Sequence, residues 1–127
     1  IDRRSDWLVQ KGSTQAVANT AWAFATLGAT SAKLFPEIEK RSDWLVLKGS
    51  TQNIANVAWA FATLGIKSPA LFAKIEKRAS WLVENGSTQH IANTAWAFGR
   101  LGFKSNKLFG EIDKKADWLV QEGNAQE

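Results

Sequence analysis

The side chains in this sequence that are best suited to bind a ligand are amides that recur in pairs. Three stretches each carry a glutamine followed four residues later by an asparagine: Gln15 and Asn19, Gln52 and Asn56, Gln89 and Asn93. Residues four apart share one face of a helix. Because an amide both donates and accepts hydrogen bonds, the row predicts either a ladder that bonds nucleobases or a structural ladder that ties each helix to the next backbone.

Positions that differ between the three stretches are the better candidates for discriminating one ligand from another. The residue after each glutamine is Ala16, then Asn53, then His90. Asparagine can bond the edge of a base, and histidine can stack or bond. We expect these positions to be exposed, either as contact residues or as unconstrained surface. Two further variable sets lie on or beside the same polar arc: Thr20, Val57 and Thr94, and Thr26, Thr63 and Arg100.

Basic residues recur with the same step and suggest a second kind of contact. Pairs stand at Arg3-Arg4, Lys40-Arg41, Lys77-Arg78 and Lys114-Lys115. They predict either a cationic row suited to a phosphate backbone or local pairing, as of Glu37 with Arg41 and Glu111 with Lys115. Lys11 and Lys48 directly precede predicted helix N-termini, which favour anions. The net charge of +4 permits an anionic partner without requiring one.

Other kinds of chemistry have little support. The chain has no cysteine and one histidine, so His90 would lack partners as a metal ligand. No glycine-rich phosphate loop and no paired carboxylates in an evident pocket occur. We therefore expect no enzymatic activity, no cofactor and no metal. No apolar run approaches the roughly 18–20 residues that a membrane span needs.

A tandem repeat of 37 residues positions all of these side chains. Its step is marked by tryptophans at Trp7, Trp44, Trp81 and Trp118. We divide the chain, as a single helical-repeat array, into 1–12 (partial), 13–49, 50–86, 87–123 and 124–127 (partial). Neither end resembles the capping repeat that closes a solenoid, so we expect a fragment of a longer array.

Each repeat is predicted to form two helices. In the copy 50–86, Ser50 is a good N-cap and Gly65 a good C′ residue for the first helix, and the second runs from Ser68 to Gly86. Pro36 should bend the start of the second helix in the preceding copy. The fold class is therefore all-α, an α-solenoid of tandem 37-residue helical hairpins, with about three full repeats and partial repeats at both ends.

The tryptophans are assigned to packing. We expect Trp22, Trp59 and Trp96 of the first helices to be core residues. Trp44, Trp81 and Trp118, at the edge of the second helix's apolar stripe, should pack between repeats rather than against bases. By analogy with other helical-hairpin solenoids, we take the first helix to line the concave side.

The first helix carries a recognisable sequence, Ser13-Thr-Gln-Ala-Val-Ala-Asn-Thr-Ala-Trp-Ala-Phe-Ala-Thr-Leu-Gly28, which returns nearly unchanged from Ser50 to Gly65. It resembles the signature of octotricopeptide-type repeats and their 37-residue, heptatricopeptide relatives in organellar proteins that carry RAP domains, approximately Ser-Pro-Gln-x-Leu-Ala-Asn-x-x-Trp-Ala-x-Ala-x-Leu-Gly. The resemblance covers nearly the whole chain. Two departures are the threonines Thr14, Thr51 and Thr88 in place of proline, and a period that favours the shorter subgroup.

The resemblance implies superhelices that bind single-stranded RNA, roughly one nucleotide per repeat, in chloroplasts or mitochondria. Such proteins act in RNA stability, processing or translation. The leading hypothesis is therefore a sequence-selective RNA-binding repeat, which predicts a basic concave face and a steep loss of affinity with salt. The alternative is a protein–protein interaction scaffold or structural subunit of a large organellar complex, which a neutral or apolar concave face would favour.

Overall fold

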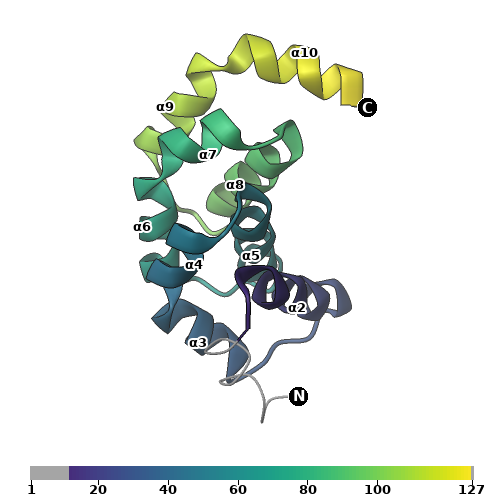
Figure 1. Cartoon of the computed structure of the whole chain (residues 1–127), viewed down its shortest axis with the longest axis vertical. Helices are drawn as coiled ribbons and strands as arrows, with labels where there is room; N and C mark the ends of the chain where they lie inside the picture. Colours follow the sequence, from purple (N-terminus) through teal and green to yellow (C-terminus); the bar gives the residue numbers. More distant parts are fainter. Residues whose placement is uncertain (1–11, 127) are drawn as a thin grey trace.

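The computed structural model of the chain describes residues 12–126, with side chains described as far as Glu122. Within that range all regular structure is α-helical, as the sequence predicts, and no strand occurs there (Figure 1). In chain order the helices are α2 (Thr14–Leu27), α3 (Leu34–Lys40), α4 (Ser42–Lys48), α5 (Thr51–Thr63), α6 (Pro69–Lys77), α7 (Ala79–Asn85), α8 (Thr88–Arg100), α9 (Asn106–Lys114) and α10 (Ala116–Gln126).

Helices α2, α5 and α8 are the first helices of the three repeats, and they begin and end where the sequence predicts. Each is preceded by a serine whose side chain accepts a hydrogen bond from the backbone N–H three residues on: Ser13, Ser50 and Ser87. Each is followed by a glycine with a φ of 70° to 76°: Gly28, Gly65 and Gly102. A left-handed backbone strains any L side chain, so these glycines end the helices.

The second helix of each repeat is not continuous, so the prediction of a single helix from Ser68 to Gly86 is wrong. It is divided into α6 and α7 at Arg78, whose φ of −105° and ψ of 20° depart from helical values. The matching residues Arg41 and Lys115 divide the other two copies. The apolar spacing runs through the break without a phase shift, and for that reason the hydrophobic pattern does not reveal it.

The break brings Arg78 to the junction between two repeats. Its Nη1 donates hydrogen bonds to the carbonyl oxygens of Val46 at 2.8 Å and Leu47 at 3.1 Å. These carbonyls belong to the last turn of α4, where they have no partner within the helix. A cation at a helix C-terminus is also favoured by the helix dipole, so Arg78 joins α4 to the following repeat.

Pro36 acts on the start of α3 rather than bending its interior. The sister helices α6 and α9 begin at Pro69 and Asn106, whereas α3 begins at Leu34, two residues later in the repeat. This later start leaves Pro36 in the first turn, where a backbone N–H would have no intrahelical partner. The expected bend is thus replaced by a shorter helix.

The core is built around a row in which α5 packs against α2 on one side and α8 on the other. Small side chains let these helices approach closely, and the alanines of the α2 and α5 stripes are at most 3% exposed: Ala18, Ala21, Ala25, Ala55, Ala58 and Ala62. Phenylalanines join the row to the second helices. Phe72 of α6 lies 4.9 Å from Phe98 and 4.8 Å from Phe103, measured between ring centroids.

The helices form two columns (Figure 1). Segments α3, α4, α6, α7 and α9 follow one another along one edge, and α2, α5 and α8 lie beside them, on the side toward which α10 turns. The predicted boundary at Gly123 lies inside α10, which runs on to Gln126. The first predicted partial repeat, 1–12, lies outside the described residues except for Gly12. Its marker Trp7 lies outside them.

Candidate nucleic-acid interface

One stripe of side chains runs along α2, α5 and α8 on the surface of the first-helix column. Glutamine, asparagine and tryptophan follow one another at steps of four and three residues, which keeps them on one helix face. We call this surface the amide–tryptophan face, and it comprises Gln15, Asn19, Trp22, Gln52, Asn56, Trp59, Gln89, Asn93 and Trp96. All three glutamines are exposed, and the other members are exposed or half-buried. Arg100 continues the stripe on α8.

Trp22 and Trp96 are not core residues, so their assignment to the core is wrong, and Trp59 packs against the core without being buried in it. Trp22 and Trp96 are each 45% exposed, and Trp59 is half-buried. The rings of Trp22 and Trp59 stack, with centroids 6.0 Å apart and planes inclined at 29°. The core between the helices is filled by alanine instead, which leaves the indoles at its rim. The sequence spacing could have predicted this exposure, because Trp22 stands three residues after Asn19 and so lies on the polar arc.

The glutamine and asparagine amides face solvent rather than a neighbouring backbone. Gln89 Nε2 donates to Asn93 Oδ1 at 3.0 Å within α8. Between described residues, the amides of the other two pairs form no hydrogen bond to a neighbouring helix. The structural-ladder hypothesis is therefore not borne out for these residues, and they remain available to a ligand.

The variable positions after each glutamine have a structural role in two of the three copies. Asn53 is 7% exposed, and its Oδ1 accepts from Ser50 N at 3.1 Å and from Thr14 Oγ1 at 2.9 Å. The first bond closes a capping box at the start of α5 and the second joins α2 to α5. Asn53 is thus buried rather than exposed as expected, and Ala16 is half-buried at the matching position.

His90 repeats this arrangement one step along the row. Its Nδ1 accepts from Ser87 N at 3.4 Å and lies 3.0 Å from Thr51 Oγ1, which donates to it. Burial lowers the pKa of His90 from its ordinary value of 6.5, because burial disfavours the charged imidazolium. The neutral ring, with its hydrogen on Nε2, is therefore the form that links α5 to α8.

Acidification should weaken the fold through His90. Because its pKa is lower in the folded chain than in the unfolded one, the unfolded state binds the proton first as pH falls below 6.5. The stability is present above that value and is lost as pH falls through the folded pKa. We expect the urea concentration at the unfolding midpoint to be lower at about pH 5.5 than at about pH 7.5. His90→Asn, which copies Asn53, should remove the part of this decrease that comes from the histidine. His90 is the only histidine. An identical pH dependence in the variant would contradict the expectation.

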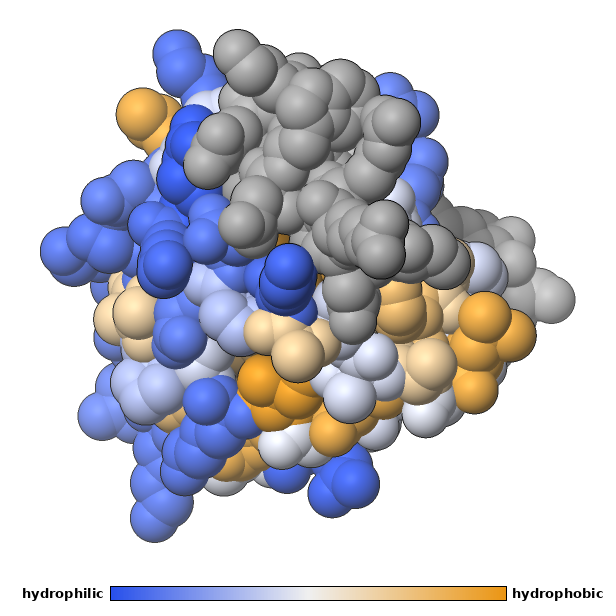
Figure 2. Space-filling view, turned by 90° about the horizontal axis from the view of Figure 1, so that it is seen from below, coloured by the Kyte–Doolittle hydropathy of each residue, from blue (hydrophilic) through white to orange (hydrophobic). Residues whose placement is uncertain are grey.

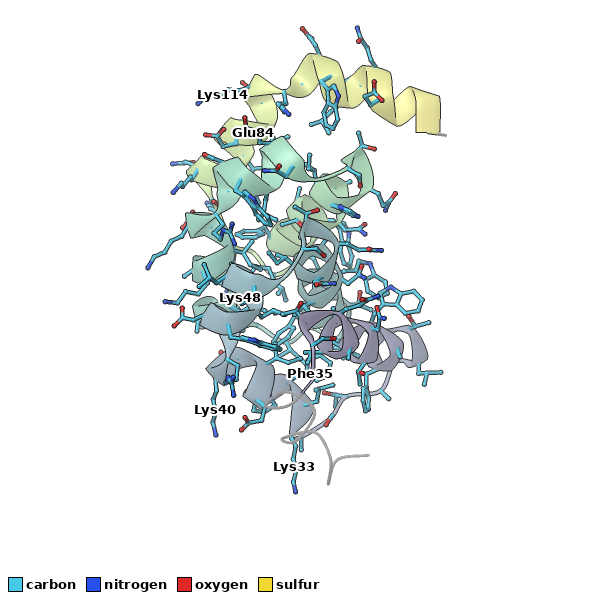
Figure 3. The ribbon with its side chains drawn as sticks, viewed as in Figure 1. Lys33, Phe35, Lys40, Lys48, Glu84 and Lys114 are labelled. Atoms are coloured by element: carbon cyan, nitrogen blue, oxygen red, sulfur yellow. The ribbon has the colours of Figure 1, made fainter. Side chains whose placement is uncertain are left out.

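Charged residues gather on the other column. The sequences of α2, α5 and α8 hold one residue that is charged at neutral pH, Arg100. Viewed from below, the strongly hydrophilic surface lies on the side of the second-helix column, and the α2 side is paler and more apolar (Figure 2). Lys33 and Lys40 project outward from α3 and its N-cap (Figure 3). The expected basic concave face is not found on the first helices.

The recurring basic pairs divide their roles. The second member packs on the tryptophan three residues later: Arg41 lies 5.5 Å from the Trp44 ring and Arg78 3.9 Å from that of Trp81. Lys115 lies 4.8 Å from Trp118. These three tryptophans are half-buried and pack against the core, and their packing between repeats rather than against bases stays a prediction.

In the three basic pairs that the structure describes, the first member is exposed, and two of these lysines pair with acids. The partners are Lys40 with Glu37 at 3.3 Å and Lys114 with Glu111 at 3.5 Å. The expected pairs of Glu37 with Arg41 and Glu111 with Lys115 are therefore wrong, because Arg41 and Lys115 lie over indole rings instead. Lys48 is exposed at the end of α4, and Lys11 lies outside the described residues.

Two other kinds of site are absent within residues 12–126. No group of three or more histidine, aspartate or glutamate side chains there is arranged to hold a metal ion. None of the helices in that range combines the length and apolarity needed to cross a membrane.

The fold and this face together define an all-α protein of tandem helical repeats with a solvent-facing row of amides and indoles. Residues 3–127 match the model of the RNA-editing substrate-binding complex 6 protein family, and the chain belongs to that family. No curated protein matches the sequence, and no solved structure matches it either.

Proposed function

We propose that this chain binds single-stranded RNA, with sequence selectivity, on the amide–tryptophan face. The observation that carries the proposal is an indole at the surface beside an amide pair, exposed on α2 and α8 and half-buried on α5. Helical repeats that read RNA commonly present two or three side chains to each base. A tryptophan for stacking and two amides for the base edge fit that scheme.

The neutral character of the face determines how binding would work. Base–aromatic stacking contributes about 1–3 kcal/mol per base and depends little on charge. With Arg100 as the charged group on α8, stacking and amide bonds would supply most of the affinity. The salt dependence should therefore be shallow rather than steep, and short arrays should bind weakly because contacts add per repeat.

The family name supports this reading. It refers to a complex that binds the substrate of RNA editing, and such a substrate is RNA. On the resemblance to octotricopeptide-type repeats, we further propose that the protein acts in a chloroplast or mitochondrion, in RNA stability, processing or translation. We propose a binding module without catalytic activity of its own and without a cofactor.

Arg100→Thr tests the proposed phosphate contact, because Thr26 and Thr63 stand at the matching positions. We expect weaker binding to a fluorescein-labelled pool of short single-stranded RNAs. The slope of log affinity against log salt should become shallower by about 0.7, the value for one phosphate contact on a single strand. The measurement is fluorescence anisotropy over a range of salt concentrations.

Lys33→Thr is the matched control, because it removes one exposed charge from the second-helix column. It should leave the affinity and the slope almost unchanged. Equal effects of the two variants would indicate a diffuse charge effect and contradict a contact at Arg100. No detectable RNA binding at low salt, in an array extended by further repeats, would refute the proposed function.

A protein-interaction scaffold is the second candidate, and the neutral first-helix surface favours it. The same RNA titration separates the two functions. A scaffold that uses this face for a protein partner would bind no RNA at any salt concentration, and tryptophan variants of the face would weaken only the protein contact.

A further inference from the structure

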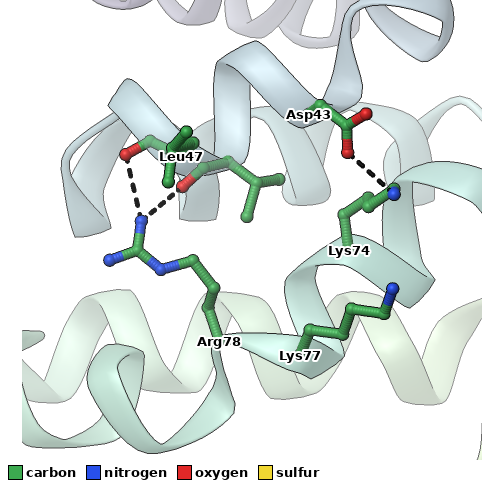
Figure 4. A pocket seen from close by; sticks show the side chains of 6 residues that line it. Asp43, Leu47, Lys74, Lys77 and Arg78 are labelled. Atoms are coloured by element: carbon green, nitrogen blue, oxygen red, sulfur yellow. Dashed lines mark hydrogen bonds and ion pairs between the residues drawn. The ribbon is translucent and has the colours of Figure 1, made fainter.

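A pocket of about 330 Å³ lies at the junction between two repeats, on the second-helix column (Figure 4). It opens between α4 on one side and α6 with the start of α7 on the other. The residues that line it are Asp43, Val46, Leu47, Lys74, Lys77 and Arg78. It is separate from the amide–tryptophan face, none of whose residues line it.

The pocket offers apolar surface between charged side chains, and hydrogen bonds join its two sides. Leu47 is 65% exposed, a large apolar surface left open at the pocket. The Arg78 guanidinium is held by the two carbonyl bonds to α4 at 2.8 Å and 3.1 Å and lies over the Trp81 ring. The two carbonyl bonds hold the two sides of the pocket together before any ligand arrives, so binding costs little conformational freedom.

The surroundings carry excess positive charge. Lys74 pairs with Asp43 at 2.8 Å, which leaves the carboxylate neutralised. Lys77 is exposed and takes part in none of the ion pairs found among the described residues. Three cationic side chains therefore meet one carboxylate at the pocket, and an acidic ligand would be attracted.

The next junction along the array has different side chains at the equivalent repeat positions. Glu84 stands where Leu47 does, and Glu111 stands where Lys74 does. Glu111 pairs with Lys114, the counterpart of Lys77. Of the two junctions that the structure describes, the first therefore carries the open leucine and the unbalanced charge, and the fold does not require them.

We propose that this pocket docks an acidic peptide segment of a partner protein, with one aliphatic or aromatic side chain in the pocket on Leu47. Carboxylates that flank this side chain pair with Lys77. The pocket combines apolar area with positive charge, the complement of such a segment. A nucleic-acid backbone matches it less well, because phosphates gain nothing from the leucine. This inference is independent of the proposed RNA binding.

The test uses a fluorescein-labelled peptide of alternating leucine and glutamate, titrated with the chain and followed by anisotropy. Leu47→Glu copies Glu84 of the next repeat, so the variant should fold. We expect it to weaken binding by about tenfold or more, since it removes apolar area and adds a repelling charge. Lys77→Glu should weaken binding as well. Leu27→Glu changes a leucine that is 82% exposed on α2 and should have no effect.

Several outcomes would overturn the proposal. They are no binding of the wild-type chain at about 1 mM, equal binding of the Leu47→Glu variant, or equal binding of a peptide with lysine in place of glutamate. Displacement of the peptide by single-stranded RNA would assign the pocket to nucleic acid. A wild-type dimer that Leu47→Glu converts to a monomer would assign it to a second copy of this chain.

Discussion

Replacing Phe72 by alanine is expected to lower the free energy of unfolding by about 3–5 kcal/mol, the range for a fully buried phenylalanine. Phe72 is 1% exposed and its ring contacts Phe98 and Phe103 at 4.9 Å and 4.8 Å. The two contacts link α6 with α8 and the turn after it. Alanine would leave a cavity between the repeats that rigid helices cannot close.

Phe109→Ala is the matched control for this substitution. Phe109 stands at the same position of the next repeat, but it is 42% exposed. Its loss should cost much less, by an amount nearer to that of ordinary surface substitutions. Urea unfolding followed by tryptophan fluorescence and circular dichroism measures both variants. Equal effects of the two substitutions would contradict the core that we describe.

Trp96→Ala is expected to weaken RNA binding roughly 5- to 150-fold, which corresponds to the ~1–3 kcal/mol of one base stacked on an aromatic ring. Trp96 is 45% exposed and Arg100 stands one turn after it. Trp96 makes no ring contact with another described residue, so its indole is free to stack on a base. Trp22 and Trp59 stack on each other, and replacing both should reduce affinity further.

The control for stacking is again Phe109→Ala, because it removes an aromatic ring of similar exposure outside the amide–tryptophan face. RNA affinity should not change in this variant. Urea unfolding of Trp96→Ala should show a smaller loss of stability than Phe72→Ala, since the indole is 45% exposed and Phe72 is 1% exposed. Wild-type RNA affinity in the Trp96→Ala variant would rule out base stacking at this residue.

The sequence predicts the first helices well because their ends depend on local chemistry. A serine at the N-cap and a glycine at C′ satisfy the end groups of one helix without help from the rest of the chain. The division of the second helix at Arg78 depends instead on carbonyls of another repeat, at Val46 and Leu47. No property of the residues around Arg78 alone reveals that contact.

The candidate site was predicted in part, and the errors have one cause. The glutamine–asparagine pairs lie on the open face as expected, whereas Asn53 is buried and Trp22 is exposed. A helical wheel gives the direction of each side chain but not which directions a neighbouring helix covers. Because α5 is covered on two sides, a polar residue such as Asn53 lies under α2, and the indoles lie at the uncovered rim.

The side-chain bonds between repeats have a consequence for how such a protein can change in length. Ser68 donates to Glu39 at 2.6 Å, and Ser105 donates to Glu76 at 2.5 Å, each across 29 residues. Donor and acceptor always belong to successive repeats. Recombination that inserts or deletes a whole repeat therefore leaves each of these serine–glutamate bonds with a partner of the same kind. Duplication or deletion of a repeat can change the length of the molecule one unit at a time without compensating mutations at these serine and glutamate positions.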